Sequence, residues 1–461
     1  MGDKVHDVDV DMSHFKGKFK RYVVNWVGKG VESVVGELHV GEEVLGIDFD
    51  EYDSGVGSGD DEVIRKLKIR NLKVEHNSTT LQDLLQQKVQ ISISKTAVYR
   101  AKEKAQKKIR GNFHEQYSLL RDYIMELKQK NPNTTVKLAF SYRSVNPAST
   151  TRVFQRIYVC LGSLNQGFKE LGREIIGLDG AFMKGPYLGQ LLTAVSMDGN
   201  NWIYPVAYAL VESECRNSWE WLLQCLGDDL ELPHNVNFTF IYDRQKGILQ
   251  AVNSLFPSAE HRFCLKHIHE NLKTRFRGCG FRDHFWFAAT RTTVVEFKRA
   301  MDEIRQQDTI VYEWLRAIPV TIWSRAHFSG RTKCDILLNN ICESFNSKFV
   351  KGREIPIISC LEFVREYIMR MIVVVQGVID VCTGPLTPTA TQILKVNKEA
   401  AEKKWELTDI PCKHAVAAMN NMHKYEFDVG IPEDWVHTAY TLETWNQVYS
   451  NKIEPIVGAT Y

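Results

Sequence analysis

The stretch Ile175-Ile176-Gly177-Leu178-Asp179 is an apolar run that ends in a carboxylate. A second apolar run, Phe238-Thr239-Phe240-Ile241-Tyr242, ends in the same way at Asp243. Runs this short and this apolar are typical of buried strands, so each acid is expected at the end of a strand. Taken singly, each aspartate has a simpler interpretation, as a turn residue for Asp179 and as the N-cap of a following helix for Asp243.

A third acid, Glu343, lies in the run Asn339-Asn340-Ile341-Cys342-Glu343-Ser344-Phe345-Asn346, near the start of an expected helix. Its simpler interpretation is a solvated position on that helix. Together, however, two acids at strand ends and a third further along the chain supply the oxygen ligands of a magnesium-dependent phosphoryl-transfer site. The site exists only if the fold brings the three acids together.

The order of the elements around the two aspartates predicts how the strands are arranged. Asp198-Gly199-Asn200-Asn201 joins two strand-like runs and is a strong hairpin signal. A strand, a hairpin, a helix and a further strand in this order are the layout of a ribonuclease-H-like sheet, in which the first and fourth strands are neighbours. We therefore predict an α/β fold with a mixed sheet of this type. The expected strands are 137–142, 152–159, 174–179, 189–198, 202–211 and 237–243, and the expected helices are 114–130, 218–230, 247–256 and several within 264–330.

Four ordered motifs resemble those of the Mutator-like (MULE, MuDR) transposases of plants, and the resemblance covers about residues 90–461. The motifs are Gly177-Leu178-Asp179-Gly180-Ala181-Phe182-Met183-Lys184-Gly185, Tyr242-Asp243-Arg244-Gln245-Lys246-Gly247, Arg262-Phe263-Cys264-Leu265-Lys266-His267 and Asn339 to Asn346. The resemblance implies a ribonuclease-H-like domain with an all-helical insertion before the final acid. It also implies that Asp179, Asp243 and Glu343 form a catalytic triad that binds Mg²⁺ or Mn²⁺.

Two Cys/His pairs are candidate zinc ligands, although each supplies only half of the usual four. Cys264 and His267 form a Cys-x-x-His that the family also shows, and the simpler interpretation is a buried thiol beside a partly buried histidine. Cys412 and His414 lie in a tail that resembles the second half of a SWIM zinc finger, but the Cys-x-Cys that normally precedes it is absent. We expect this tail to fold through Trp405, Trp435 and Trp445.

Composition is that of a globular protein, with 44% hydrophobic and 25% charged residues and a net charge of +2, so binding of nucleic acid cannot be inferred from total charge. A basic run is the exception, and it is expected either to contact DNA phosphates or to form a solvated helix face. The ten cysteines are irregularly spaced, which favours reduced thiols, and no apolar run is long enough to span a membrane. The residues of the basic run that are candidates for DNA contact are Arg100, Lys102, Lys104, Lys107, Lys108 and Arg110.

These observations predict a Mutator-like DNA transposase, or a recent derivative, that acts in the nucleus on terminal inverted repeats and target DNA, with a homo-oligomer expected in the transposition complex. Two alternatives are a domesticated, catalytically silent DNA-binding or transcription-regulating protein, and an inactive relic. The expected division is a strand-rich segment (1–40), an acidic linker (41–63), a remnant of a DNA-binding module (64–93), a basic helical segment (94–135), the ribonuclease-H-like domain (136–382, insertion about 264–338), a linker (383–404) and a partial SWIM-type tail (405–461).

Overall fold

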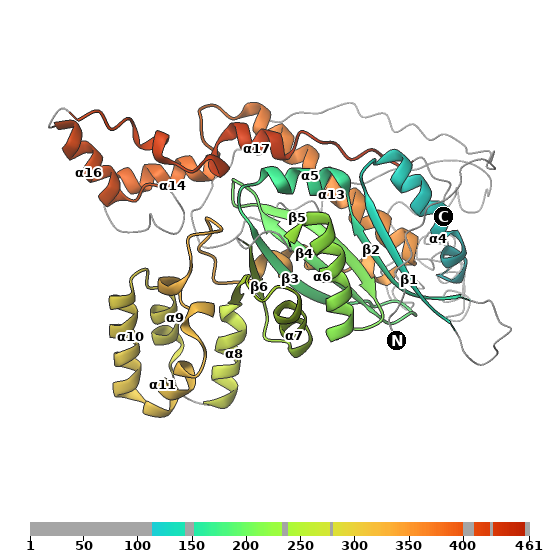
Figure 1. The fold of residues 1–461 in the computed structure, drawn as a ribbon, viewed down its shortest axis with the longest axis horizontal. Coiled ribbons are helices and arrows are strands. Elements are labelled where there is room, and N and C mark those ends of the chain that lie inside the picture. The colour runs from blue at the N-terminus through green and yellow to red at the C-terminus, as the bar shows by residue number, and fades with distance from the viewer. Residues whose placement is uncertain are drawn as a thin grey trace, which may run out of the picture.

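The computed structural model describes residues 113–142, 152–232, 238–276, 280–399, 410–424 and 427–456. The predictions for the acidic linker, the N-terminal modules and the basic run 100–110 therefore lie outside the described residues. At the centre is one mixed sheet (Figure 1). Its strands are β1 (Thr135–Tyr142), β2 (Arg152–Cys160), β3 (Ile175–Phe182), β4 (Gln190–Met197), β5 (Ile203–Val211), β6 (Thr239–Tyr242) and β7 (Glu260–Phe263).

The seven strands lie in the order β1-β2-β5-β4-β3-β6-β7. The pairs from β1 to β3 are antiparallel, whereas β3–β6 and β6–β7 are parallel. Every residue of β4 is buried, which places this strand in the middle of the core. The predicted hairpin is confirmed, because β4 and β5 pair in antiparallel register on either side of the turn at 198–201.

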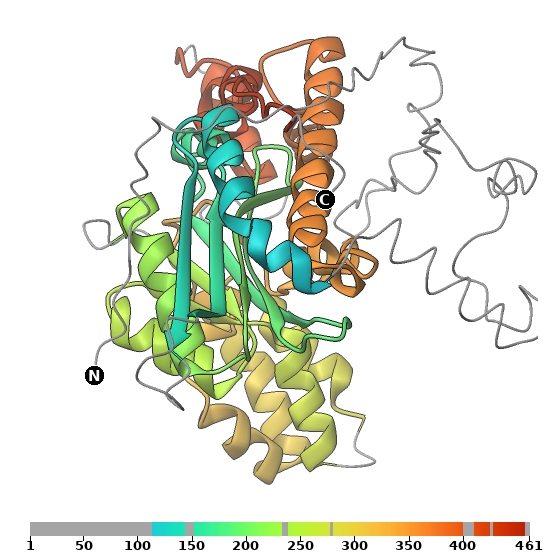
Figure 2. The ribbon, with the colours of Figure 1, turned by 90° about the vertical axis from the view of Figure 1, so that its right-hand side faces the viewer.

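Helices cover both faces of the sheet (Figure 2). One face carries α6 and α7, and α6 inserts the fully buried Trp219 into the core. The other face carries α4, α12 and the long α13, which crosses behind the strands in Figure 1. These helices are α4 (Phe113–Lys130), α5 (Gly162–Glu170), α6 (Arg216–Leu230), α7 (Lys246–Leu255), α12 (Asn340–Ser347) and α13 (Ile357–Val381).

Between β7 and α12 the chain leaves the sheet and forms a separate helical lobe, at the lower left of Figure 1. The lobe falls within the range, about 264–338, for which a helical insertion was expected. It packs around the buried Trp323, whose ring stacks on Phe285 with 5.6 Å between ring centroids. The elements of the lobe are α8 (Leu265–Arg275), α9 (Arg282–Thr290), α10 (Val294–Gln307), α11 (Thr309–Arg316), η3 (Val320–Ile322) and η4 (Arg325–His327).

The C-terminal tail has a small apolar core of its own and is also tied to the sheet. A buried carboxylate in the β4–β5 turn, Asp198, accepts hydrogen bonds from Trp445 Nε1 (2.8 Å) and the Tyr449 hydroxyl (2.9 Å). The main elements of the tail are α14 (Pro388–Glu399), α16 (Lys413–Lys424) and α17 (Leu442–Val448), and the short helices η6 (Pro432–Trp435) and η7 (Thr438–Tyr440) lie between α16 and α17. A further short helix, η5 (Gly352–Glu354), precedes α13. The apolar core consists of Leu386, Ala390, Leu394, Ile410, Val416, Val436 and Tyr440.

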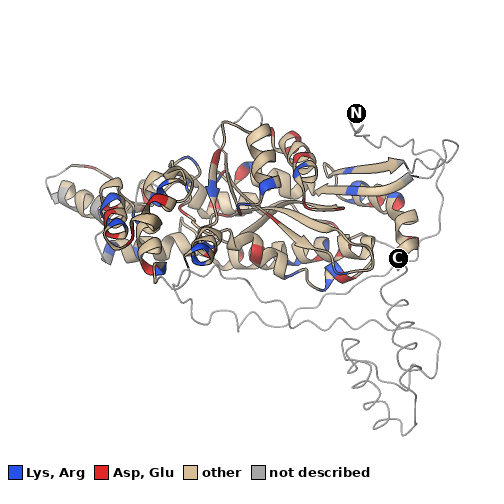
Figure 3. Ribbon diagram, turned by 90° about the horizontal axis from the view of Figure 1, so that it is seen from below, with Lys and Arg blue, Asp and Glu red and all other residues tan. Residues whose placement is uncertain are grey.

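The mixed α/β fold and the six expected strands are confirmed, whereas β7 and α5 were not predicted. The sequence of β7, Glu260-His261-Arg262-Phe263, is mostly charged and does not have the apolar pattern of a buried strand. Arg262 can be buried there because its Nη1 donates a hydrogen bond to the Cys334 carbonyl at 2.6 Å. Charged residues lie mainly on the helices, with both signs interspersed (Figure 3). None of the helices that the structure describes combines the length and the apolar character needed to cross a membrane.

Candidate functional site

The pairing of β3 with β6 positions the two aspartates. Gly177 on β3 is in register with Ile241 on β6, and each aspartate lies two residues beyond its member of this pair. Because the strands are parallel, Asp179 and Asp243 emerge at the same edge of the sheet. The expected adjacency of the two strands is therefore confirmed.

Helix α12 is held across β3 by two asparagines. Asn339 Nδ2 donates to the Leu178 carbonyl at 2.9 Å, and Asn346 Nδ2 donates to Asp179 Oδ2 at 2.8 Å. The approach is so close that a Cβ atom on Gly177 would lie 2.6 Å from Asn339 Oδ1 and 2.8 Å from the sulfur of Cys342. Glycine at this position thus allows the helix to reach the strand.

Glu343 lies in the first turn of α12, three residues before Asn346 and hence on the same side of the helix. Burial raises the pKa of Asp179 to about 6, with the negative charges of Asp243 and Glu343 adding to the effect and the Asn346 hydrogen bond opposing it. The hydroxyl of Thr193 on β4 donates to Asn346 Oδ1 at 3.1 Å and so fixes the amide. The charges of Asp243 and Glu343 therefore reach Asp179, although the three acids are not a group of described residues whose ligand atoms all lie within 4.8 Å of one another.

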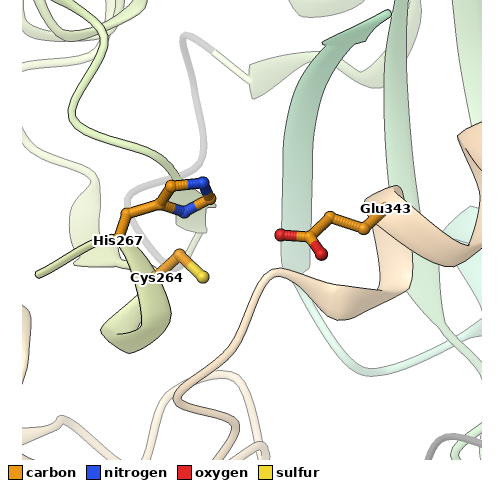
Figure 4. Close-up of side chains that lie close together, drawn as sticks. All are labelled: Cys264, His267 and Glu343. Carbon is orange, nitrogen blue, oxygen red and sulfur yellow. The ribbon is translucent and has the colours of Figure 1, made fainter. Parts of the chain in front are cut away.

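The side chain of Glu343 nevertheless has partners outside this pair of aspartates. Lys266 Nζ lies 2.7 Å from Glu343 Oε2 in a half-exposed ion pair. In the part of the chain that the structure describes, the group of three candidate ligands with atoms all within 4.8 Å is Cys264, His267 and Glu343. Figure 4 shows the Glu343 carboxylate pointing toward the sulfur and the imidazole.

Cys264 and His267 are placed together by the start of α8. The buried Cys264 is the N-cap residue, and its sulfur accepts a hydrogen bond from the Asn339 backbone at 3.3 Å. His267 Nδ1 is buried without a hydrogen-bond partner among the described residues. The adjacent Cys264 sulfur is the main reason that the pKa of His267 rises to about 9, and the Asp243 and Glu343 carboxylates add to it.

A thiolate, an imidazole and a carboxylate are all ligands that Zn²⁺ accepts, and three protein ligands with one open position are typical of catalytic zinc sites. The sequence predicted only Cys264 and His267 for this site. Glu343 was not expected there, because the sequence assigns it to the magnesium triad. It also lies far along the chain from this pair, 77 residues after the neighbouring Lys266. The carboxylate that was predicted for the magnesium triad thus lies beside the two candidate zinc ligands.

Glu214, which follows β5, is a fourth acid at this edge that the sequence interpretation missed. Its Oε2 would lie 2.9 Å from a Cβ atom on Gly180, beside Asp179. Burial raises the pKa of Glu214, as do the charges of Asp243 and Asp179, while the Trp219 indole donates to Oε1 at 3.3 Å and opposes the rise. Nothing in the sequence distinguishes Glu214 from the nearby Glu212, whose carboxylate instead pairs with Arg156.

In the tail, Cys412 is buried and His414 lies on α16. Neither observation tests zinc binding by this pair, which stays a prediction. Trp445 is fully buried, as expected of a residue that holds the tail together. Trp435 is 46% exposed and contributes less than expected. Trp405 lies outside the described residues.

Part of the chain is similar to known proteins. Residues 175–271 match the family model of the MULE transposase domain, a stretch that contains Asp179, Asp243, Cys264 and His267 but ends before Glu343. The chain is also 24% identical over 151 residues to Protein FAR1-RELATED SEQUENCE 6 of Arabidopsis thaliana, a match that covers 32% of this chain and 21% of that protein. The chain therefore resembles Mutator-like transposases, and its match spans about a fifth of the length of this curated relative.

Proposed function

We propose that this protein cleaves and joins DNA as a Mutator-like transposase does, with a ribonuclease-H-like core and a divalent cation held by Asp179, Asp243 and Glu343. The observation that carries the proposal is the parallel β3–β6 pair, which brings two acids to one edge where α12 adds a third. The strand order β5-β4-β3-β6-β7, antiparallel up to β3 and parallel beyond it, supports the ribonuclease-H-like assignment.

The donor set fits a hard cation. Burial raises the pKa of Asp179, and the charges of Asp243 and Glu343 add to the rise, so a cation that prefers oxygen ligands would relieve a real electrostatic cost. Magnesium retains several waters and needs only a few protein ligands, so the three acids do not have to form a closed cage. When bound, such cations activate water and stabilise the leaving oxygen in phosphodiester cleavage.

The residues around the acids prepare them for this task. Asn346 and Thr193 fix the orientation of Asp179, and the Gln245 backbone donates to Asp243 Oδ1 at 3.0 Å. Glu343 must exchange its Lys266 partner for the aspartate side of the site, and the exposed position of that ion pair makes the exchange inexpensive. We expect hydrolysis at the end of the element, followed by attack of the freed 3′-hydroxyl on target DNA, in the nucleus.

A second candidate function is a DNA-binding derivative that no longer cuts. The ion pair of Glu343 with Lys266 and its proximity to Cys264 and His267 favour this alternative, because both draw the third acid away from Asp179. The incomplete finger in the tail also favours it. Both candidates predict DNA binding, so cleavage is the property that separates them.

The decisive experiment is magnesium-dependent nicking of a duplex that carries the terminal inverted repeat. We expect wild-type protein to nick it, and Asp179→Ala to bind it without nicking. Asp228→Ala is the matched control, since Asp228 is an exposed aspartate on α6. A folded wild-type protein that binds DNA but leaves it intact in Mg²⁺ and Mn²⁺ would favour the silent derivative.

A further inference from the structure

An open pocket of about 380 Å³ lies where the sheet meets the helical lobe. Its volume falls within the range of roughly 300–1,000 Å³ that is usual for sites of small organic ligands. One wall begins at the residue directly after Asp243, and the others come from α8 and α11. The lining residues are Arg244, Asn271, Thr274, Arg275 and Trp314.

The charge of this pocket is positive. Arg244 and Arg275 both line it, and its other described lining residues carry no negative charge. Neither arginine forms an ion pair with another residue in the described ranges, and each guanidinium instead lies near an aromatic ring, Phe263 at 5.8 Å and Phe276 at 5.9 Å. Two guanidinium groups without carboxylate partners are suited to a phosphate, which arginine binds through paired hydrogen bonds.

The pocket also has an aromatic wall. Trp314 on α11 is half-buried, and its ring packs edge-on against Phe276 with 6.0 Å between the centroids. This contact holds the indole in one place while part of it stays accessible from the pocket. Asn271 adds an amide that can hydrogen-bond to the edge of a base, and the Thr274 hydroxyl, which donates to the Glu270 carbonyl at 2.8 Å, can still accept a hydrogen bond. Phosphate-binding cations beside an aromatic ring are what proteins use to hold unstacked nucleotides.

We propose that this pocket binds one nucleotide of the DNA strand next to the scissile phosphate, with its base stacked on Trp314 and its phosphate between Arg244 and Arg275. The proposal rests on the proposed function, because it takes the scissile phosphate to lie at Asp243. Arg244 follows Asp243 directly in the chain, and on this ground the proposal places the pocket next to the acids. The helical lobe thereby becomes a clamp for an unpaired nucleotide.

Binding of a fluorescently labelled single-stranded oligonucleotide to the full chain in EDTA tests the pocket without cleavage. Trp314→Ala should weaken binding by about 5- to 150-fold, the usual effect of losing one stacked base. Trp314→Phe keeps a ring and should restore most of the affinity. Arg275→Gln should lower the affinity and reduce the salt dependence by about one phosphate contact. Arg316→Gln is the matched control on α11, because Arg316 is exposed and pairs with Glu313.

Abasic substitutions, placed one at a time along the oligonucleotide, locate the nucleotide. At one position the abasic site should remove the effect of Trp314→Ala, because the stacking partner is then already missing. The proposal is overturned if folded Trp314→Ala and Arg275→Gln bind like Arg316→Gln. It is also overturned if a free deoxynucleoside monophosphate competes as strongly as the oligonucleotide, since the pocket would then be a small-molecule site.

The pocket and the proposed function fail in different ways. If Trp314→Ala weakens binding in EDTA but wild-type protein never nicks DNA in Mg²⁺, the nucleotide site is supported and the proposed nuclease activity is refuted. If wild-type protein nicks DNA and Trp314→Ala binds and cuts it equally well, the nuclease activity is supported and the nucleotide site is refuted.

Discussion

Asp179→Asn should make the protein more stable in the absence of metal. In the folded chain the pKa of Asp179 is about 6, compared with 3.8 for an unperturbed carboxyl, chiefly because the group is buried beside other acids. At 1.36 kcal/mol per pKa unit, this difference limits the cost of ionising Asp179 in the fold to about 3 kcal/mol. Asparagine carries no charge and keeps an oxygen that accepts the hydrogen bond from Asn346.

The sign of the pH dependence follows from the raised pKa. The stability contributed by protonated Asp179 is fully present below about pH 4 and is lost as the pH rises through about 6. Thermal unfolding in EDTA should therefore show Asp179→Asn gaining up to about 3 kcal/mol over wild type at pH 7.5 and little at pH 4. Metal binding should favour wild type instead, because the cation needs the negative charge of Asp179, which the variant lacks.

Magnesium provides the second half of this test. Ligand binding to the folded state alone raises the unfolding temperature, so Mg²⁺ should stabilise wild type above pH 6 and leave Asp179→Asn unchanged. Asp228→Asn, at an exposed position on α6, is the control and should show neither the gain in EDTA nor a change in the response to Mg²⁺. An Asp179→Asn variant that is less stable than wild type in EDTA at pH 7.5 would refute the argument that burial and nearby charges make ionised Asp179 unfavourable.

Three further predictions follow from close contacts. Gly177→Ala should displace α12 from β3, lowering stability by about 1–3 kcal/mol and abolishing DNA nicking, as thermal unfolding and cleavage assays would show. Asp198→Ala should leave Trp445 Nε1 and the Tyr449 hydroxyl buried without an acceptor, so the tail should become sensitive to limited proteolysis at a cost of about 2–5 kcal/mol. Micromolar Zn²⁺ should inhibit nicking in Mg²⁺, and Cys264→Ser should relieve the inhibition; equal inhibition of both proteins would contradict a shared Glu343.

The sequence predicts the part of this fold that depends on local pattern. The apolar runs before Asp179 and Asp243 identify β3 and β6, and the turn at 198–201 identifies the hairpin, because each signal is complete within about ten residues. Strand β7 escapes prediction because its buried arginine is satisfied by carbonyls more than sixty residues away. No local pattern can indicate such a distant partner.

The candidate site shows the same division. The positions of Asp179 and Asp243 follow from strand order, whereas the partners of Glu343 follow from how α8 and α12 approach each other. Lys266 and Cys264 reach this region only because the chain returns from the helical lobe beside the start of α8, where the Leu265 backbone donates to the Leu337 carbonyl at 2.8 Å. The sequence therefore identifies the three acids but not the competition for one of them.

That competition bears directly on whether the protein cuts DNA. Asp179 and Asp243 are fixed by strands and by backbone or amide donors, so their positions cost nothing further when a cation binds. Glu343 is held by a half-exposed lysine and lies near a thiol and an imidazole, which attract a softer cation than the aspartates do. Under the proposed function, the same scaffold would favour cleavage when magnesium draws Glu343 toward Asp179, and would be silent when zinc or Lys266 retains it on the other side.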